Sequence, residues 1–80
     1  MISHMELSKE MLHKRIRNGE ISFGGNNKLK IFGKLECSSG KRMKKENRVF
    51  FNSTLEAIQL GFRPCGHCMR NEYRIWKLKN

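Results

Sequence analysis

Hydrophobic residues recur at helical intervals near the start of the chain. The periodic positions are Leu7, Met11, Leu12 and Ile16. Ser3 and Glu6 have the spacing of a capping box, so we expect a helix that begins near Ser3. The pair Asn18-Gly19 predicts its end.

The middle of the chain alternates between apolar and polar residues. Ile21 and Phe23 begin one short alternating segment, and a second runs through residues 29–35. The stretch Gly24-Gly25-Asn26-Asn27 between them is typical of a turn, which predicts a β-hairpin. A third strand is expected at residues 49–51, after a polar and basic stretch interpreted as a long loop.

Two further helices are predicted in the last third. Ser53 and Glu56 form a second capping box, and Gly61 is placed to end that short helix in a left-handed conformation. A C-terminal helix follows, with Met69, Tyr73 and Trp76 on one face. The expected fold is α/β in the α+β sense. It is one small domain over residues 1–80, in which an N-terminal, a short middle and a C-terminal helix flank a sheet of about three strands.

Composition restricts the range of functions. A chain of 80 residues with 38% hydrophobic content has a modest core, which argues against a large catalytic cleft, and we predict no catalytic residue. A net charge of +10 favours a polyanionic partner, nucleic acid before an anionic membrane surface, although such charge also serves solubility. Because the chain has neither a long apolar run nor a signal-peptide pattern, we expect a cytoplasmic protein with no membrane association, and we assume a monomer.

Three cysteines predict a metal site rather than disulfides. Cys65 and Cys68 form a C-x-x-C knuckle whose Gly66 permits a tight turn, and Cys37 lies earlier in the chain. A metal joining all three would staple a small domain. The alternatives are a redox C-x-x-C pair and cysteines that merely pack as small apolar side chains. Zinc prefers four ligands, and the sequence leaves the fourth open among His67, His13, His4, a carboxylate, water or none.

Several segments follow one another in a distinctive order: Gly25 to Phe32, Cys37, Lys41 to Lys44, Glu46 to Phe51, Glu56 to Ile58, Gly61 to Cys65, and Cys68. Together they resemble the Ada-type metal-binding domain, the amino-terminal zinc module of the bacterial adaptive-response alkylation-repair protein. The resemblance covers roughly residues 21–70.

The resemblance implies a small α/β fold built on one zinc, with a surface that faces DNA. In that family four cysteines hold the zinc, and the first also accepts a methyl group from a DNA methylphosphotriester. By position, Cys37, Cys65 and Cys68 match the second, third and fourth zinc ligands. The first falls at Gly33, which can neither bind zinc nor accept methyl.

Basic residues around the cysteines are the candidate DNA contacts. The set is Lys41, Arg42, Lys44, Lys45, Arg48 and Arg63. Such residues bind phosphates without reading sequence, although an ordinary solvated loop would have the same composition. The aromatic residues are interpreted as core rather than as base-stacking platforms.

The sequence therefore predicts a stand-alone zinc-binding module, not an enzyme, that binds the DNA backbone and is linked to DNA alkylation repair or its regulation. One alternative is a stoichiometric methyl acceptor that uses one of the cysteines. The other is a protein-interaction adaptor without DNA binding.

Overall fold

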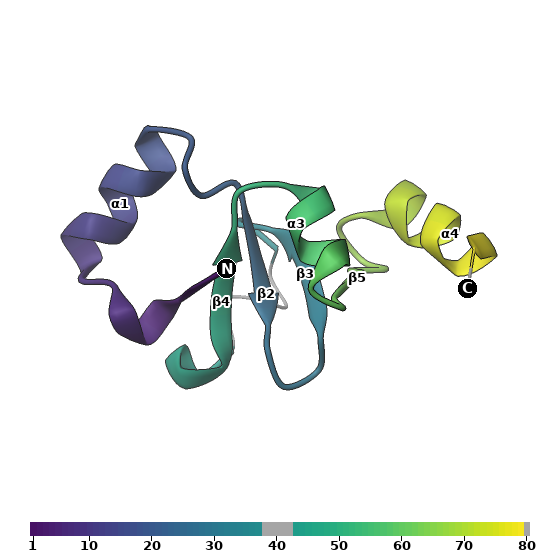
Figure 1. Cartoon of the computed structure of the whole chain (residues 1–80), viewed down its shortest axis with the longest axis horizontal. Helices are drawn as coiled ribbons and strands as arrows, with labels where there is room; N and C mark the ends of the chain where they lie inside the picture. The colour runs from purple at the N-terminus through teal and green to yellow at the C-terminus, as the bar shows by residue number, and fades with distance from the viewer. Residues whose placement is uncertain (38–42, 80) are drawn as a thin grey trace.

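The computed structural model describes residues 1–37 and 43–79, and Figure 1 shows how its elements are arranged. The elements, in chain order, are β1 (Ile2–Ser3), the 3₁₀ helix η1 (His4–Glu6), α1 (Lys9–Arg17), β2 (Phe23–Asn26), β3 (Ile31–Lys34), the 3₁₀ helix η2 (Lys45–Asn47), β4 (Arg48–Phe51), α3 (Thr54–Gln59), β5 (Arg63–Pro64) and α4 (Arg70–Lys79). The α+β fold class predicted from the sequence is confirmed. None of the helices in the described ranges has the length and apolar character that crossing a bilayer requires.

The sheet has five strands in the described ranges, in the order β1-β4-β2-β3-β5, where about three were expected. The additional strands, β1 and β5, have two residues each. Two residues are too short to show alternation, so only their pairing identifies them: β1 runs antiparallel to β4, and β5 runs parallel to β3. Pro64 lies in β5 at the edge of the sheet, where a missing N–H breaks no ladder hydrogen bond.

Each face of the sheet has its own hydrophobic cluster, because successive residues of a strand point to opposite sides. Val49 and Phe51 of β4 pack with Ala57 of α3 on one face. Phe50 between them joins Leu7 on the other face. The first cluster also contains Phe32, Phe62 and Met69, and the second contains Ile21. All five phenylalanines thus have core roles, as expected, since Phe23 packs against the first cluster.

The first helix begins later than the sequence suggested. Ser3 pairs with Val49 in the sheet, and although it stands at the N-cap position of the 3₁₀ helix η1, its side chain makes no capping hydrogen bond. The N-cap of α1 is Ser8, whose Oγ accepts a hydrogen bond from the Met11 amide at 3.1 Å. The Ser3–Glu6 prediction of the helix start is wrong because tertiary pairing with β4 outweighs a local capping signal.

The hairpin turn is also shifted along the chain. Gly24 and Gly25, expected in the turn, lie in β2, and the turn follows at residues 27–30, where Asn26 Oδ1 accepts hydrogen bonds from the amides of Lys28 and Leu29. A Cβ at position 25 would lie 2.9 Å from the Phe51 ring, so the glycine permits close packing rather than a turn.

The later helices agree with the prediction. Ser53 Oγ accepts a hydrogen bond from the Glu56 amide at 3.2 Å, and Gly61 has a φ of +90° just after α3. Tyr73 and Trp76 of α4 stack with ring centroids 6.1 Å apart.

Candidate metal centre

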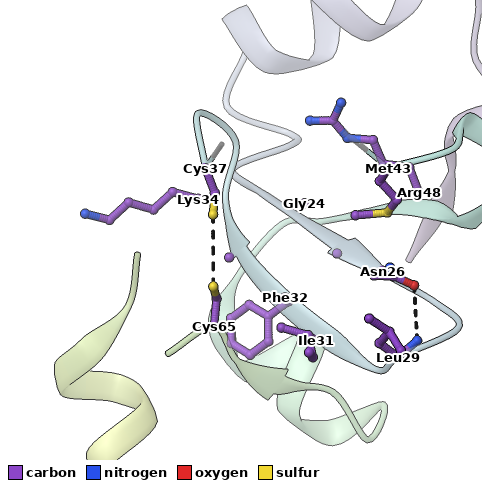
Figure 2. A pocket seen from close by; sticks show the side chains of 12 residues that line it. Gly24, Asn26, Leu29, Ile31, Phe32, Lys34, Cys37, Met43, Arg48 and Cys65 are labelled. Atoms are coloured by element: carbon purple, nitrogen blue, oxygen red, sulfur yellow. Dashed lines mark hydrogen bonds between the residues drawn. The ribbon is translucent and has the colours of Figure 1, made fainter. Parts of the chain in front are cut away.

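Neighbouring ends of β3 and β5 bring the cysteines together. Cys37 follows β3 in a turn whose amide donates to the Lys34 carbonyl at 3.1 Å. Cys65 follows β5, and its amide donates to the Phe32 carbonyl of β3 at 2.7 Å. The Sγ atoms of Cys37 and Cys65 are therefore 4.0 Å apart (Figure 2). Cys68 completes a group in which all three sulfur atoms lie within 4.8 Å of one another.

This geometry fits a zinc ion. Zn–S bonds of about 2.3 Å place the sulfurs of a tetrahedral site about 3.8 Å apart, close to the spacing found here. Two main-chain amides already point at the sulfurs: that of Lys34 donates to Cys68 Sγ and that of His67 to Cys65 Sγ, both at 3.4 Å. Such hydrogen bonds favour thiolates, the form that binds metal.

Without a metal the cluster disfavours thiolates. Burial first, and then the neighbouring sulfurs of Cys37 and Cys65, raise the pKa of Cys68 to about 11, because the hydrogen bond from the Lys34 amide only partly opposes them. A divalent cation would compensate both the burial and the repulsion. The metal-site interpretation of the three cysteines therefore has a direct electrostatic reason.

Position 33 faces the same cluster. A Cβ built on Gly33 would lie 2.7 Å from Cys68 Sγ and 3.2 Å from Cys65 Cβ. A side chain here would therefore point at the metal, but glycine has no donor atom to offer.

The histidines considered from the sequence do not join the group of potential ligands that the described residues form. His67 is exposed, and its main-chain amide is what contacts the cluster. His4 lies edge-on to the Phe50 ring, with centroids 5.3 Å apart, and His13 is exposed on α1. In this conformation the three cysteines are the donors that the described part of the chain offers to a metal.

A cavity of about 210 Å³ adjoins the cluster. Cys37, Cys65, Gly33, Met43 and Arg48 are among the residues that line it. In Figure 2 the side chains of Cys37 and Cys65 point toward each other on one side of the view, and Met43 and Arg48 lie on the other, with Gly24 between them.

The predicted DNA contacts fall at different places. Lys41 and Arg42 lie outside the described residues. Lys44 and Lys45 are exposed at η2. The Arg48 guanidinium lies 5.3 Å from the centroid of the Phe50 ring and lines the cavity, and that of Arg63 lies 5.1 Å from the centroid of Tyr73.

Three residues near these features were missed in the sequence. Lys28 and Lys30 lie in the β2–β3 turn beside η2, since the Asn27 amide donates to the Asn47 carbonyl at 2.8 Å. Lys34 lines the cavity next to the cysteines. A correct hairpin register would have placed the two turn lysines, but nothing in the sequence alone pairs that turn with η2.

The chain was compared with known protein families, curated proteins and solved structures. The family model described as the metal binding domain of Ada matches residues 8–71. No curated protein and no solved structure gives a significant match. The match begins before the resemblance seen in the sequence, so it takes in α1 as well. Together with the three-cysteine cluster it identifies zinc as the metal that suits this site. The chain belongs to the family of the metal binding domain of Ada.

Proposed function

We propose that this protein is a zinc-stabilised module that binds DNA through its backbone phosphates, with a role in alkylation repair or its regulation. The observation that carries the proposal is a group of exposed lysines at one end of the sheet, which we call the basic end. It consists of Lys28, Lys30, Lys44 and Lys45.

Two segments that are distant in sequence form the basic end. The β2–β3 turn contributes the first two lysines, and η2 with its preceding residue contributes the others. The hydrogen bond between Asn27 and Asn47 holds the segments side by side, and both lie at the lower edge of the sheet in Figure 1. Lysines that the fold brings together from separate segments are better support for a binding surface than a run of basic residues within one loop is.

The charge of the basic end is not neutralised within the described part of the chain. The ion pairs found there join Arg15 to Glu20 and the terminal amine to Glu56, and neither includes a lysine of this group. The pKa of His4 is lowered first by burial and then by the charges of Lys45 in the basic end and of the neighbouring Arg48, so these cations act on groups around them. When these lysines neutralise DNA phosphates, counterions are released from the DNA, which favours binding.

Contacts of this kind would not select a base sequence. The lysines project from a turn and a 3₁₀ helix, and neither element has the length with which helices or ribbons enter the major groove. We therefore expect similar affinity for unrelated duplexes.

A salt titration tests the proposal. If about four or five cations neutralise phosphates, log affinity should fall with log salt concentration with a slope of roughly −4 on duplex DNA. Replacing Lys44 and Lys45 with alanine should flatten that slope by about one to two units and weaken two unrelated duplexes equally. Fluorescence anisotropy of labelled duplexes measures both quantities.

The matched control is the double variant Lys77→Ala/Lys79→Ala in α4, which removes the same charge from a helix at the right-hand end of the molecule, away from the basic end (Figure 1). It should change the slope less than the η2 variant does. Absence of binding at low salt, or binding that ignores salt, would remove DNA as the partner and leave a protein adaptor as the better function.

A further inference from the structure

The three-cysteine cluster supplies one donor fewer than zinc prefers. No histidine or carboxylate joins the group in the described residues. Residues 38–42, which follow Cys37, are Ser, Ser, Gly, Lys and Arg, so by sequence they contain no usual zinc ligand. A structural zinc site is closed by four protein ligands, whereas a site with three keeps a position for an outside ligand.

The direction of this fourth position is set by Gly33. Gly33 lines the cavity together with Cys37 and Cys65, so an outside ligand can approach the metal from the cavity side. Gly33 pairs with Gly24 across β2 and β3, and paired residues of an antiparallel ladder face the same side. Among the described residues, the two facing glycines therefore leave a shallow strip of sheet beside the cluster, bordered by Leu35, whose Cδ2 would lie 3.7 Å from a Cβ at Gly24.

The cavity over this strip has room for more than water. Its volume of about 210 Å³ compares with ~10–15 Å³ for a single water in the same kind of measure. Leu29, Ile31 and Met43 supply apolar walls. A small organic molecule fits these dimensions and walls better than a chain of ordered waters.

A cation lies at the end of the strip away from the cysteines. The Nε and Nη2 atoms of Arg48 lie 3.9 Å from a Cβ built on Gly24, so the guanidinium borders the strip itself. Arg48 is half-buried, and burial lowers its pKa, yet it forms no ion pair among the described residues. A half-buried guanidinium is best compensated by a carboxylate or similar anion that accepts charge-assisted hydrogen bonds.

We propose that the zinc of this protein binds a small organic thiolate that also carries a carboxylate. The thiolate occupies the fourth coordination position at Gly33, and the carboxylate reaches Arg48 along the glycine strip. Sulfur suits a metal that already has three thiolate ligands. On binding, the thiol loses its proton to solvent as the Zn–S bond forms, and no oxidant or reductant takes part.

The test uses the full chain loaded with cobalt(II), whose visible absorption reports the ligands of the metal, under anaerobic conditions with a phosphine as reductant. The probe is 3-mercaptopropionate. Saturation should increase the sulfur-to-cobalt charge-transfer absorption while the cobalt stays with the protein on gel filtration. Propionate, which lacks the thiol, should leave the spectrum unchanged. 2-Mercaptoethanol, which lacks the carboxylate, should bind roughly tenfold more weakly, the factor expected for one charge-assisted hydrogen bond.

Variants separate the two ends of the site. Arg48→Gln should remove the preference for 3-mercaptopropionate over 2-mercaptoethanol, whereas Arg74→Gln, an exposed arginine of α4, should preserve it. Gly33→Cys should show a four-sulfur spectrum without added thiol and should not respond to the probe.

His67→Gln separates an outside ligand from an internal one. The proposal expects its cobalt spectrum without added thiol to match that of the wild type. A changed spectrum would identify His67 as the fourth ligand and overturn the proposal. A cobalt-loaded protein that does not respond to the probe, or that loses its cobalt to it, would also overturn the proposal while leaving the zinc module intact. Failure to take up cobalt or zinc at all would overturn the zinc module itself.

Discussion

At the scale of single residues, the glycine at position 33 has two effects on the cysteine cluster. It removes a potential zinc ligand, and it removes the thiol that the family resemblance places there as methyl acceptor. Among the described residues no histidine or carboxylate takes its place, because the group of potential metal ligands consists of Cys37, Cys65 and Cys68.

We therefore expect no methyl transfer from a DNA methylphosphotriester to this chain. The remaining cysteines should serve as zinc ligands, and none of them occupies the position of the family's acceptor. Intact mass spectrometry of zinc-loaded protein after incubation with methylphosphotriester DNA should show no added methyl. A methyl group on Cys37, Cys65 or Cys68 would contradict this expectation and favour the alternative of a stoichiometric acceptor.

The cysteine cluster could be predicted at this scale because its signal is local and chemical. A C-x-x-C knuckle places two sulfurs together without knowledge of the rest of the fold. The role of Arg48 at the cavity could not be predicted in the same way. It depends on the register of β4 against β2, which pairs Arg48 with Asn26 and places its side chain above Gly24.

At the scale of elements, the N-terminal segment shows where local signals fail. Ile2 and Ser3 pair with Phe50 and Val49, so the segment before α1 completes an edge of the sheet. The capping-box patterns at Ser3 and at Ser53 are alike in sequence, but only the Oγ of Ser53 accepts a capping hydrogen bond, from the Glu56 amide. The difference lies in the exposed ladder of β4, a distant element that sequence periodicity does not report.

His4 links this segment to the rest of the protein and makes its attachment sensitive to acid. Burial, followed by the charges of Lys45 and Arg48, lowers the pKa of His4 below its ordinary value. The unfolded chain then binds this proton more readily than the folded chain does. The stability that neutral His4 contributes is fully present above the ordinary histidine pKa of about 6.5. It is lost as the pH falls through the lower pKa that His4 has in the folded chain.

The expected result is a melting temperature that falls less between pH 7 and 5 in His4→Gln than in the wild type. Circular dichroism melts of both proteins in the same buffers measure the difference and cancel any loss of zinc common to them. His13→Gln on α1 is the matched control and should follow the wild type. An equal decrease in the melting temperature of His4→Gln and of the wild type would show that protonation of His4 does not contribute to the loss of stability in acid.

At the scale of the whole molecule, zinc would join parts that the hydrophobic clusters hold only partly. Cys37 follows the central hairpin, whereas Cys65 and Cys68 lie between β5 and α4. Tyr73 and Trp76, the aromatic residues of α4, are only half-buried, and no residue of that helix is fully buried. The attachment of β5 and α4 to the sheet should therefore depend on the metal more than the packing of α3 does.

Removing zinc should lower the melting temperature substantially. A ligand present at 100 times its dissociation constant stabilises the folded state by about 2.7 kcal/mol, which corresponds to roughly 10–20 °C for a domain of this size. Calorimetry of zinc-loaded protein with and without a chelator measures the shift. The Cys65→Ser variant, which loses one of three ligands, should melt lower and respond less to the chelator.

If metal analysis of reduced protein finds no zinc and added zinc leaves the melting temperature unchanged, the two hydrophobic clusters hold the fold alone. The cysteines would then be packed side chains, the alternative left open by their spacing in the sequence.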